Sequence, residues 1–314
     1  MAFAAADAVI LRPRAKLNLG LAVLARRSDG FHEIESLMVP VSLADRLRVR
    51  ARDDDTAINL SVRFGERLVS WPAGGLAREV PGGEENLVIR AVRALAEAEG
   101  VGRGLEIELV KEIPAAAGLG GGSSDAAAVL LAASLAWGIE PSPGRLVELA
   151  AGLGSDVPWF LGGSAAIVRG RGEAVEPVAG IPSLPVVIAL PAAGCPTAEV
   201  YRRCTPQPDL RGEAAAVAAA LAGGRLREAV GRMHNTLAAA AVAVAPEVGR
   251  LLQALRRAGA LAPLVTGSGS GCFSLCRTAA EARGIAARLA ADGWPGVYAA
   301  RLASRPVGGG VFPG

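Results

Sequence analysis

The sequence of 314 residues has few of the features that mark nucleic-acid-binding, membrane-spanning or zinc-binding proteins. Its 33 basic and 30 acidic residues nearly cancel, to a net charge of +3, and no basic run alternates with aromatic residues. This balance argues against a nucleic-acid-binding protein, although it leaves room for a polyanionic small ligand. We therefore expect a small-molecule partner and no nucleic acid.

Long uncharged segments are also missing. The longest uncharged helical run, 126–139, is shorter than the roughly 20 residues that span a bilayer. The N-terminal segment 1–16 lacks a basic n-region and carries Asp7 inside its apolar part, so it is a poor signal peptide. We expect a soluble cytoplasmic protein without membrane contact, present as a monomer or a weak homodimer.

Potential metal ligands are few and scattered. The four cysteines show no C-x-x-C spacing, and the two histidines, His32 and His234, lie far from them in sequence. This pattern predicts buried, reduced thiols and no protein-built metal site. The cysteines are Cys195, Cys204, Cys272 and Cys276.

The N-terminal half reads as strands followed by helices. Residues 16–24 alternate with period two, which places Leu17, Leu19 and Leu21 on one strand face and Lys16, Asn18 and Gly20 on the other. Residues 45–64 suggest a β-hairpin with an acidic turn, and 85–100 a helix that ends at Gly100. A strand over 105–114 and a second helix over 142–154 follow.

The C-terminal half mixes both element types in the same way. We expect strands at 184–191 and 296–302, and helices at 212–222, 225–242, 245–258 and 279–292. There is no regular βαβ alternation, so the predicted fold class is α+β. We place the domains at 1–163 and 164–300, with a loop-like tail at 301–314.

The segment "PAAAGLGGGSSD", residues 114–125, places glycines directly before an apolar helix. Glycines let the backbone approach a ligand closely, and the unpaired N–H groups of a helix start attract anions. The segment therefore predicts a phosphate cradle. It is neither a P-loop, since no lysine follows the glycines, nor a full dinucleotide fingerprint, since the third glycine of that pattern falls on Ser123.

Taken with its neighbours, this segment resembles the phosphate loop of the kinase superfamily that includes galactokinase, homoserine kinase and mevalonate kinase. Three further segments narrow the resemblance: "AKLNLGLAVLARRSDGFHEIESLM" (15–38), "GLGSDVPWFLGG" (152–163) and "VTGSGSGCFSL" (265–275). Together they are similar to the 4-diphosphocytidyl-2-C-methyl-D-erythritol kinase family. The resemblance implies a two-domain α+β fold with its active site in the cleft between domains, and ATP with Mg²⁺ as cofactors. It also implies phosphorylation of the 2-hydroxyl of a cytidine-diphosphate-linked substrate in the non-mevalonate isoprenoid pathway.

The resemblance also implies roles for individual residues on the substrate side. Lys16 and Asp156 match the catalytic pair of the family, and a neighbouring ammonium keeps a carboxylate ionised, ready to orient a hydroxyl proton. The substrate side includes Asn18, the cytosine-binding Phe31 and His32, and Thr197 with Tyr201, which closes over the base. Without the resemblance, Asp156 would be read as a turn or N-cap residue and Lys16 as a solvated strand residue.

On the nucleotide side, the family pattern assigns a cradle for the ATP phosphates and a less closely matched adenine pocket. The adenine pocket would involve Asn86 and Lys111. The cradle comprises Pro114, Gly118, Gly120, Gly121, Gly122, Ser123 and Ser124. Ser123 or Ser124 would offer Mg²⁺ a hydroxyl, with phosphates and water as its other ligands.

At one position the chain departs from the family pattern, and three alternative functions stay open. The family usually has Asn-Asp-Leu where this chain has Asn235-Thr236-Leu237, which removes a carboxylate. A related kinase for homoserine or mevalonate is disfavoured by the "DGFH" segment, because those substrates contain no cytosine. A nucleotide-binding relative without turnover is disfavoured by the intact Lys16, Asp156 and serine set, and a dinucleotide-dependent oxidoreductase by Ser123.

Overall fold

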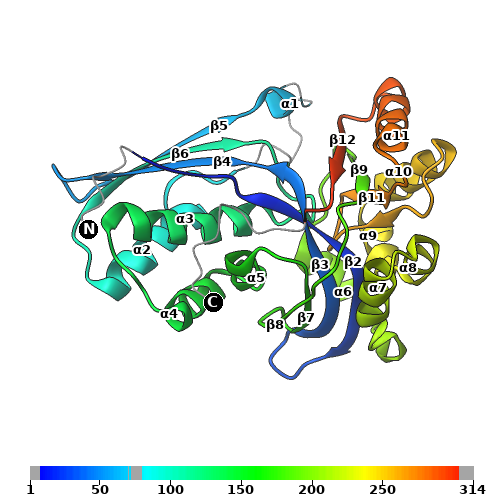
Figure 1. Cartoon of the computed structure of the whole chain (residues 1–314), viewed down its shortest axis with the longest axis horizontal. Coiled ribbons are helices and arrows are strands. Elements are labelled where there is room, and N and C mark those ends of the chain that lie inside the picture. The colour runs from blue at the N-terminus through cyan, green and yellow to red at the C-terminus, as the bar shows by residue number, and fades with distance from the viewer. Residues whose placement is uncertain (1–7, 70, 72–79, 304–314) are drawn as a thin grey trace.

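The computed structural model describes residues 8–69, 71 and 80–303. Within these residues, the strands form three four-stranded sheets with helices packed against them (Figure 1). The mixture of helices and sheets confirms the predicted α+β class.

The strands are β1 Val9–Leu11, β2 Arg14–Arg26, β3 His32–Ala44, β4 Arg46–Arg52, β5 Ile58–Phe64, β6 Gly104–Lys111, β7 Ala166–Gly170, β8 Ala174–Pro177, β9 Pro185–Leu190, β10 Leu264–Val265, β11 Cys272–Leu275 and β12 Gly296–Arg301. The helices are α1 Glu66–Val69, α2 Leu87–Glu99, α3 Gly121–Trp137, α4 Pro143–Leu153, α5 Val157–Gly162, α6 Thr197–Arg203, α7 Glu213–Ala222, α8 Leu226–Arg232, α9 Ala238–Val244, α10 Pro246–Arg257 and α11 Ala279–Ala291, with 3₁₀ turns at Gly83–Glu85 and Pro208–Leu210.

The first sheet has the strand order β1-β4-β6-β5, and α2 and α3 lie beside it in Figure 1. The hairpin predicted over 45–64 is wrong, because β6 lies between β4 and β5 and pairs antiparallel with one and parallel with the other. The alternating arginines of β4 lie on a solvated face. Arg48 and Arg50 on β4 pair with Glu108 and Glu106 on β6, and these side chains are exposed.

Helix α2 begins two residues after the predicted start at 85 and ends at Gly100 as predicted. The side chain of Asn86 caps its first turn by accepting a hydrogen bond from the Val88 N–H group at 2.9 Å. At the other end, Gly100 adopts a left-handed conformation with φ of 65°, which glycine tolerates without steric cost.

The second sheet has the order β2-β3-β7-β8 and carries the strand from which Lys16 projects. Strand β7 follows the predicted domain boundary at Gly163 but pairs with β3, so backbone hydrogen bonds cross that boundary. The division at this residue stays a prediction. Of the predicted tail, Arg301 ends β12, Leu302 forms a bridge with Val41, and 304–314 lie outside the described residues.

The third sheet, β10-β11-β9-β12, lies at the opposite end of the molecule with α10 and α11 (Figure 1). The single helix predicted over 225–242 is wrong: α8 ends at Arg232 and α9 begins at Ala238. The intervening backbone instead bonds to strand β2, since Leu21 N–H donates to the His234 carbonyl and Thr236 N–H to the Leu21 carbonyl. Tertiary hydrogen bonds therefore override the local helical pattern here.

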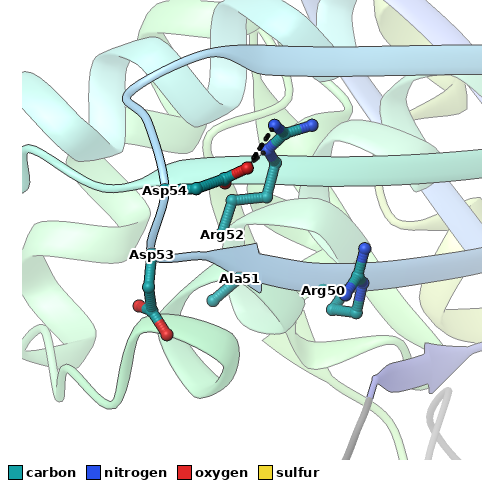
Figure 2. Close-up of a pocket in the computed structure, with 5 residues that line it drawn as sticks. All are labelled: Arg50, Ala51, Arg52, Asp53 and Asp54. Carbon is teal, nitrogen blue, oxygen red and sulfur yellow. Dashed lines mark hydrogen bonds and ion pairs between the residues drawn. The ribbon is translucent and has the colours of Figure 1, made fainter.

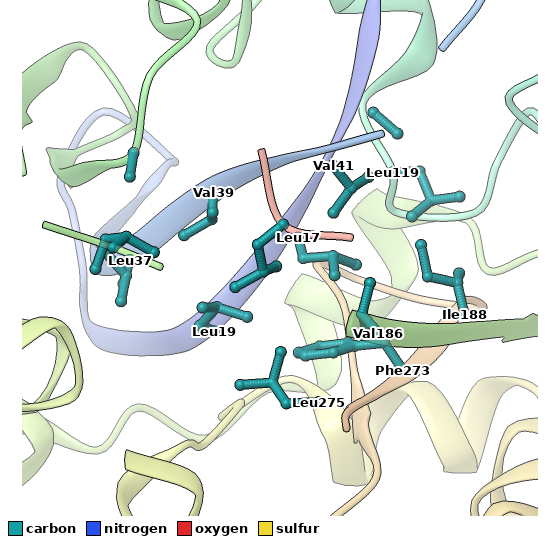
Figure 3. Close-up of a cluster of buried hydrophobic side chains, with 14 of the residues drawn as sticks. Leu17, Leu19, Leu37, Val39, Val41, Leu119, Val186, Ile188, Phe273 and Leu275 are labelled. Atoms are coloured by element: carbon teal, nitrogen blue, oxygen red, sulfur yellow. The ribbon is translucent and has the colours of Figure 1, made fainter. Parts of the chain in front are cut away.

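The central hydrophobic cluster joins the two halves of the chain (Figure 3). Leu17 and Leu19 of β2, as predicted, point into one cluster, where they lie near Ile188 of β9 and Phe273 of β11. Leu21 packs into a separate cluster with the C-terminal helices. Burying each large apolar side chain contributes about 1.5–3 kcal/mol, so this shared core fixes the position of β2 against the third sheet.

The four cysteines are buried, as predicted, and none is bonded to another. Across the described ranges, no single helix is long and apolar enough to cross a membrane. One sharply bent pair, α9 with α10, passes the same length and composition test when its two helices are taken together.

Candidate active site

Lys16 and Asp156 come together as the sequence predicts. Lys16 Nζ lies 3.7 Å from Asp156 Oδ2, and the lysine side chain is 5% exposed whereas that of the aspartate is 38% exposed. Asp156 directly precedes helix α5, but its carboxylate makes no capping hydrogen bond. Burial lowers the pKa of Lys16, and the charge of Asp156 opposes this shift. The pair thus consists of a buried cation and a carboxylate that solvent or a ligand can reach.

The predicted phosphate cradle runs directly into helix α3. Gly118 and Gly120 adopt φ of 70° and 71°, in the left-handed region that favours glycine. A Cβ atom at Gly118 would lie 2.2 Å from the Thr266 carbonyl oxygen, and one at Gly120 would lie 2.8 Å from the Phe160 ring. Both glycines are therefore required by conformation and by space. Gly120 precedes the first turn without a capping side chain.

The serines of the cradle lie in that first turn of α3. Ser124 is buried, and its Oγ has no hydrogen-bond partner among the described residues. A buried hydroxyl without a partner costs free energy unless a ligand supplies one. Gly121 and Gly122 open the same turn, and Pro114 is buried at the start of the segment.

A second glycine-rich segment, residues 266–271, packs against the cradle. The Gly271 N–H group donates to the Ala117 carbonyl at 3.1 Å. A Cβ atom at Gly267 would lie 3.3 Å from Lys16 Nζ. The segment 265–275, called the third motif below, therefore contacts the cradle and Lys16 from the C-terminal half of the chain.

The two residues predicted for the adenine pocket make close contacts within the protein. Lys111 Nζ donates to Asp45 and, at 2.6 Å, to Asp125 Oδ2, and all three side chains are buried. Asn86 caps α2 and donates to the Pro81 carbonyl at 2.8 Å. Contact of either side chain with adenine stays a prediction.

The two carboxylates around Lys111 were missed by the sequence analysis. Burial raises the pKa of Asp125 well above its ordinary range. Burial alone would lower the pKa of Lys111, but the charges of Asp125 and Asp45 outweigh it and raise that pKa. One signal could have found Asp125: it is the charged residue at the start of an otherwise apolar helix. Asp45 also accepts hydrogen bonds from the backbone N–H groups of Glu112 and Ile113, so the cluster ties β6 to the first turn of α3.

The residues predicted to hold a base lie in two adjoining groups. The Phe31 ring is 48% exposed, and the Arg171 guanidinium carbon lies 4.7 Å from its centroid. The His32 and Tyr201 ring centroids are 5.2 Å apart, and His32 Nε2 has no hydrogen-bond partner among the described residues. Thr197 lies nearby along α6, where its hydroxyl is 2.9 Å from that of Ser268.

The Tyr201 hydroxyl responds to nearby charges. Burial raises its pKa, and the charges of Asp156 and Cys204 add to the shift. Tyr201 is therefore buried and lies within range of the Asp156 charge.

The pKa of His32 predicts how base binding depends on pH. Burial, and then the positive charge of Arg26, lower this pKa from its ordinary 6.5, so the ring is neutral at pH 7. Protonation on acidification would remove its acceptor nitrogen. We expect the affinity for cytidine, measured by calorimetry between about pH 8 and about pH 5, to be constant near neutrality and to fall at the acid end. His32→Gln should bind more weakly and lose this dependence; an equal acid-induced fall in that variant would contradict the role of His32.

A surface pocket elsewhere on the molecule has a different character. Figure 2 shows it at the end of β4, lined by Arg50, Ala51, Arg52, Asp53 and Asp54. Arg52 pairs with Asp54 at 3.0 Å, and Arg50 pairs with Glu106. It includes none of the predicted site residues. Within the described ranges, no group of three or more His, Cys, Asp or Glu side chains could hold a metal ion.

Comparison with known proteins agrees with this geometry. The family model "GHMP kinases N terminal domain" matches residues 86–164, and "GHMP kinases C terminal" matches 215–295. The chain is 41% identical to the 4-diphosphocytidyl-2-C-methyl-D-erythritol kinase of Pelotomaculum thermopropionicum, over 88% of this chain and 91% of that protein. The chain belongs to the 4-diphosphocytidyl-2-C-methyl-D-erythritol kinase family. A relative from Nocardioides sp. is also 41% identical, over 92% of this chain and 96% of the other. A crystal structure of a 4-(cytidine 5'-diphospho)-2C-methyl-D-erythritol kinase superposes with a TM-score of 0.75 at 37% identity, over 96% of this chain and 100% of that chain.

The departure at Thr236 has a structural account in this member of the kinase family. Asn235 Nδ2 donates to the carbonyls of Val265 and Gly267, both at 2.8 Å. Thr236 Oγ1 accepts a hydrogen bond from the Val23 N–H group at 3.3 Å. The segment therefore holds β2 and the third motif together with an amide and a hydroxyl, without the carboxylate.

Proposed function

We propose that this kinase transfers the γ-phosphoryl group of ATP to the 2-hydroxyl of 4-diphosphocytidyl-2-C-methyl-D-erythritol. The observation that supports this most directly is the Lys16–Asp156 pair, in which Lys16 lies against the glycine cradle and the charge of Asp156 acts on Tyr201. A nucleoside triphosphate and a cytidine-linked alcohol could thus meet at one charged pair. The chain's membership of a kinase family supports the same reaction.

The chemistry assigned to the pair follows from its exposure and charge. Phosphoryl transfer depends mainly on positioning and charge neutralisation, with little covalent work for the protein. Asp156 is the accessible partner and orients the substrate hydroxyl and accepts its proton. Lys16 is buried beside it and offsets the negative charge that develops as the hydroxyl oxygen attacks.

The nucleotide phosphates would lie on the first turn of α3, where backbone N–H groups and the helix dipole favour negative charge. The unpartnered Ser124 hydroxyl fits a Mg²⁺ ion, which accepts oxygen ligands and keeps several waters. Ser123 is the alternative protein ligand. When bound, Mg²⁺ would neutralise charge on the phosphates.

The proposed reaction is tested by ATP consumption. Purified protein is given ATP, Mg²⁺ and the cytidyl substrate, with homoserine and mevalonate as control acceptors, and ADP is measured. Turnover with the cytidyl substrate alone is expected. Turnover with a control alone would keep the kinase chemistry and overturn the base-binding assignment of Phe31 and His32. A failure to form ADP with any of the three would contradict the proposed reaction.

Substitution of Phe31 tests cytosine stacking separately from catalysis. Stacking of a base on an aromatic side chain is worth about 1–3 kcal/mol, so Phe31→Ala should raise the KM for the cytidyl substrate by about 10- to 100-fold while kcat is retained. Phe31→Tyr keeps the stacking face and serves as the matched control, with KM close to that of the unaltered protein. An unchanged KM in Phe31→Ala would remove this residue from the site.

A further inference from the structure

Asn18 lies between Lys16 and two hydroxyl groups from other parts of the fold. Its Oδ1 accepts hydrogen bonds from Lys16 Nζ at 2.6 Å and from Thr266 Oγ1 at 3.3 Å. Its Nδ2 donates to Ser36 Oγ at 2.8 Å. Ser36 and Thr266 are both 0% exposed and Asn18 is 3% exposed. This network is therefore shielded from water, where each hydrogen bond has more effect than at the surface.

The backbone explains why Ser36 reaches Asn18. The register of β2 against β3 shifts between Asn18 and Gly20, which is the mark of a β-bulge. In this irregular stretch the Gly20 carbonyl accepts a hydrogen bond from Ser36 Oγ at 2.7 Å. Ser36 thus contacts β2 twice, once at the backbone and once at the Asn18 side chain.

Counting protons fixes the direction of the Asn18 amide. A serine hydroxyl has one proton to donate, and a carbonyl oxygen can only accept. Since the Ser36 proton goes to the Gly20 carbonyl, Ser36 Oγ must accept at its contact with Asn18. The NH₂ end of the amide therefore faces Ser36, and the oxygen end faces Lys16. An amide direction is assigned from its hydrogen-bond network in this way.

The reverse direction of the amide would place an NH₂ group against the Lys16 ammonium, so that two donors would face each other. Lys16 is buried, and a buried ammonium needs acceptors to remain charged. Asp156 supplies an opposite charge at 3.7 Å, and Asn18 Oδ1 supplies the hydrogen-bond acceptor at 2.6 Å. The geometry points to Ser36 as a positioning residue that fixes, through Asn18, the direction and charge of the Lys16 ammonium. This inference rests on the proposed function, in which Lys16 acts on the transferring phosphoryl group.

This role is compatible with contact between Asn18 and the substrate. Among the described residues, Nδ2 has one hydrogen-bond partner, Ser36, and an amide nitrogen carries two protons. Thr266 adds a second restraint, since its Oγ1 also accepts from the Asn18 backbone N–H at 3.2 Å. The third motif thereby contacts the same amide as β3.

A double-mutant cycle tests whether Ser36 acts through Asn18. The variants are Ser36→Ala, Asn18→Leu and the double variant, with kcat and both KM values measured by ADP release. We expect Ser36→Ala to lower kcat by about 10- to 100-fold, as a misplaced catalytic group does, with both KM values changed by less than about threefold. In the Asn18→Leu background the same substitution should change kcat by less than about twofold, because coupled residues are not additive.

The matched control is Ser134→Ala in helix α3, beyond the first turn of that helix. Ser134 is also buried, and its hydroxyl donates to the Leu130 carbonyl at 2.8 Å. Its kcat should equal that of the unaltered protein. Should Ser36→Ala fail to fold, Ser36→Cys keeps the volume with a much weaker hydrogen-bonding group and should show the same loss.

The outcomes separate this role from the proposed function. The cycle is run with whichever acceptor the unaltered protein phosphorylates. Turnover with an acceptor other than the cytidyl substrate would therefore overturn the proposed function and leave the role of Ser36 testable. Additive losses in the cycle, or a normal kcat in the Ser36 variants, would overturn the positioning role alone. A rise in both KM values together with a fall in melting temperature, reproduced by Ser134→Ala, would mark Ser36 as a packing residue. No turnover with any acceptor would overturn both.

Discussion

Asp156→Asn is expected to lower kcat by about 10²- to 10⁴-fold, the range for loss of a general base. The substitution keeps the size of the side chain but removes the group that accepts the hydroxyl proton. It also removes the negative charge 3.7 Å from Lys16 Nζ. The fold should be retained, because the Asp156 side chain is 38% exposed and does not cap α5. Steady-state kinetics and thermal unfolding measure the two effects.

Asp292→Asn provides the control for Asp156. Asp292 is an exposed aspartate that directly follows helix α11, away from the described site. Its variant should match the unaltered protein in both kcat and melting temperature. Near-normal turnover in Asp156→Asn would rule out this residue as the base and leave the reaction dependent on positioning alone.

Gly118→Ala is expected to abolish productive ATP binding. The new Cβ atom would lie 2.2 Å from the Thr266 carbonyl oxygen, a backbone atom, and 3.1 Å from the Gly269 carbonyl oxygen. The backbone φ of 70° adds strain of about 1–3 kcal/mol for a non-glycine residue. The cradle must therefore shift away from the third motif, and a shift of about 1 Å can cost about 100-fold in rate. We expect kcat/KM for ATP to fall by at least that factor.

Gly138→Ala is the control that separates the backbone strain of a left-handed conformation from displacement of the cradle. Gly138 has φ of 68° at the other end of the same helix, and a Cβ atom added there would meet nothing within 4 Å. Its variant should lose about 1 kcal/mol of stability from the left-handed conformation alone and keep its kcat/KM for ATP. Equal losses of kcat/KM in the two variants would show that the close contact with Thr266 does not matter for the cradle.

The sequence alone was enough for features that depend on a local pattern. The glycine cradle and the alternation that places Lys16 beside Asn18 each follow from neighbours within a few residues. The family resemblance then supplied the predicted roles of Lys16, Asp156, Phe31, His32 and Tyr201. Periodicity alone would have left these residues unassigned.

Features that depend on distant contacts could not be predicted in this way. Asp45, which lies between β3 and β4, pairs with Lys111 at the end of β6. A sequence pattern does not show that a charged side chain will be buried with its partner. The break between α8 and α9 arises from hydrogen bonds with Leu21, more than 200 positions earlier in the chain. Ser36 looked like any polar strand residue, because its importance comes from a bulge on the neighbouring strand.

The insertion of β6 between β4 and β5 affects the order in which the first sheet can assemble during synthesis. When β5 leaves the ribosome, β4 is already available, whereas β6 appears only after α1 and α2 have been made. The two early strands run antiparallel in the finished sheet, so nothing in their direction prevents a transient non-native hairpin. Such a pairing would have to dissociate before the native sheet could form.

Charge makes the pairing of β4 with β5 less stable than the pairing of β4 with β6. On β6, Glu106 and Glu108 face Arg50 and Arg48 of β4, whereas their neighbours on β5 are Asn59 and Ser61. Strand β5 thus has no carboxylate to offer the arginines of β4. Opposite charges across strands contribute roughly 0.2–1 kcal/mol per pair. The two glutamates therefore favour β6 over β5 as the neighbour of β4, and they make a long-lived β4–β5 hairpin less stable in the growing chain.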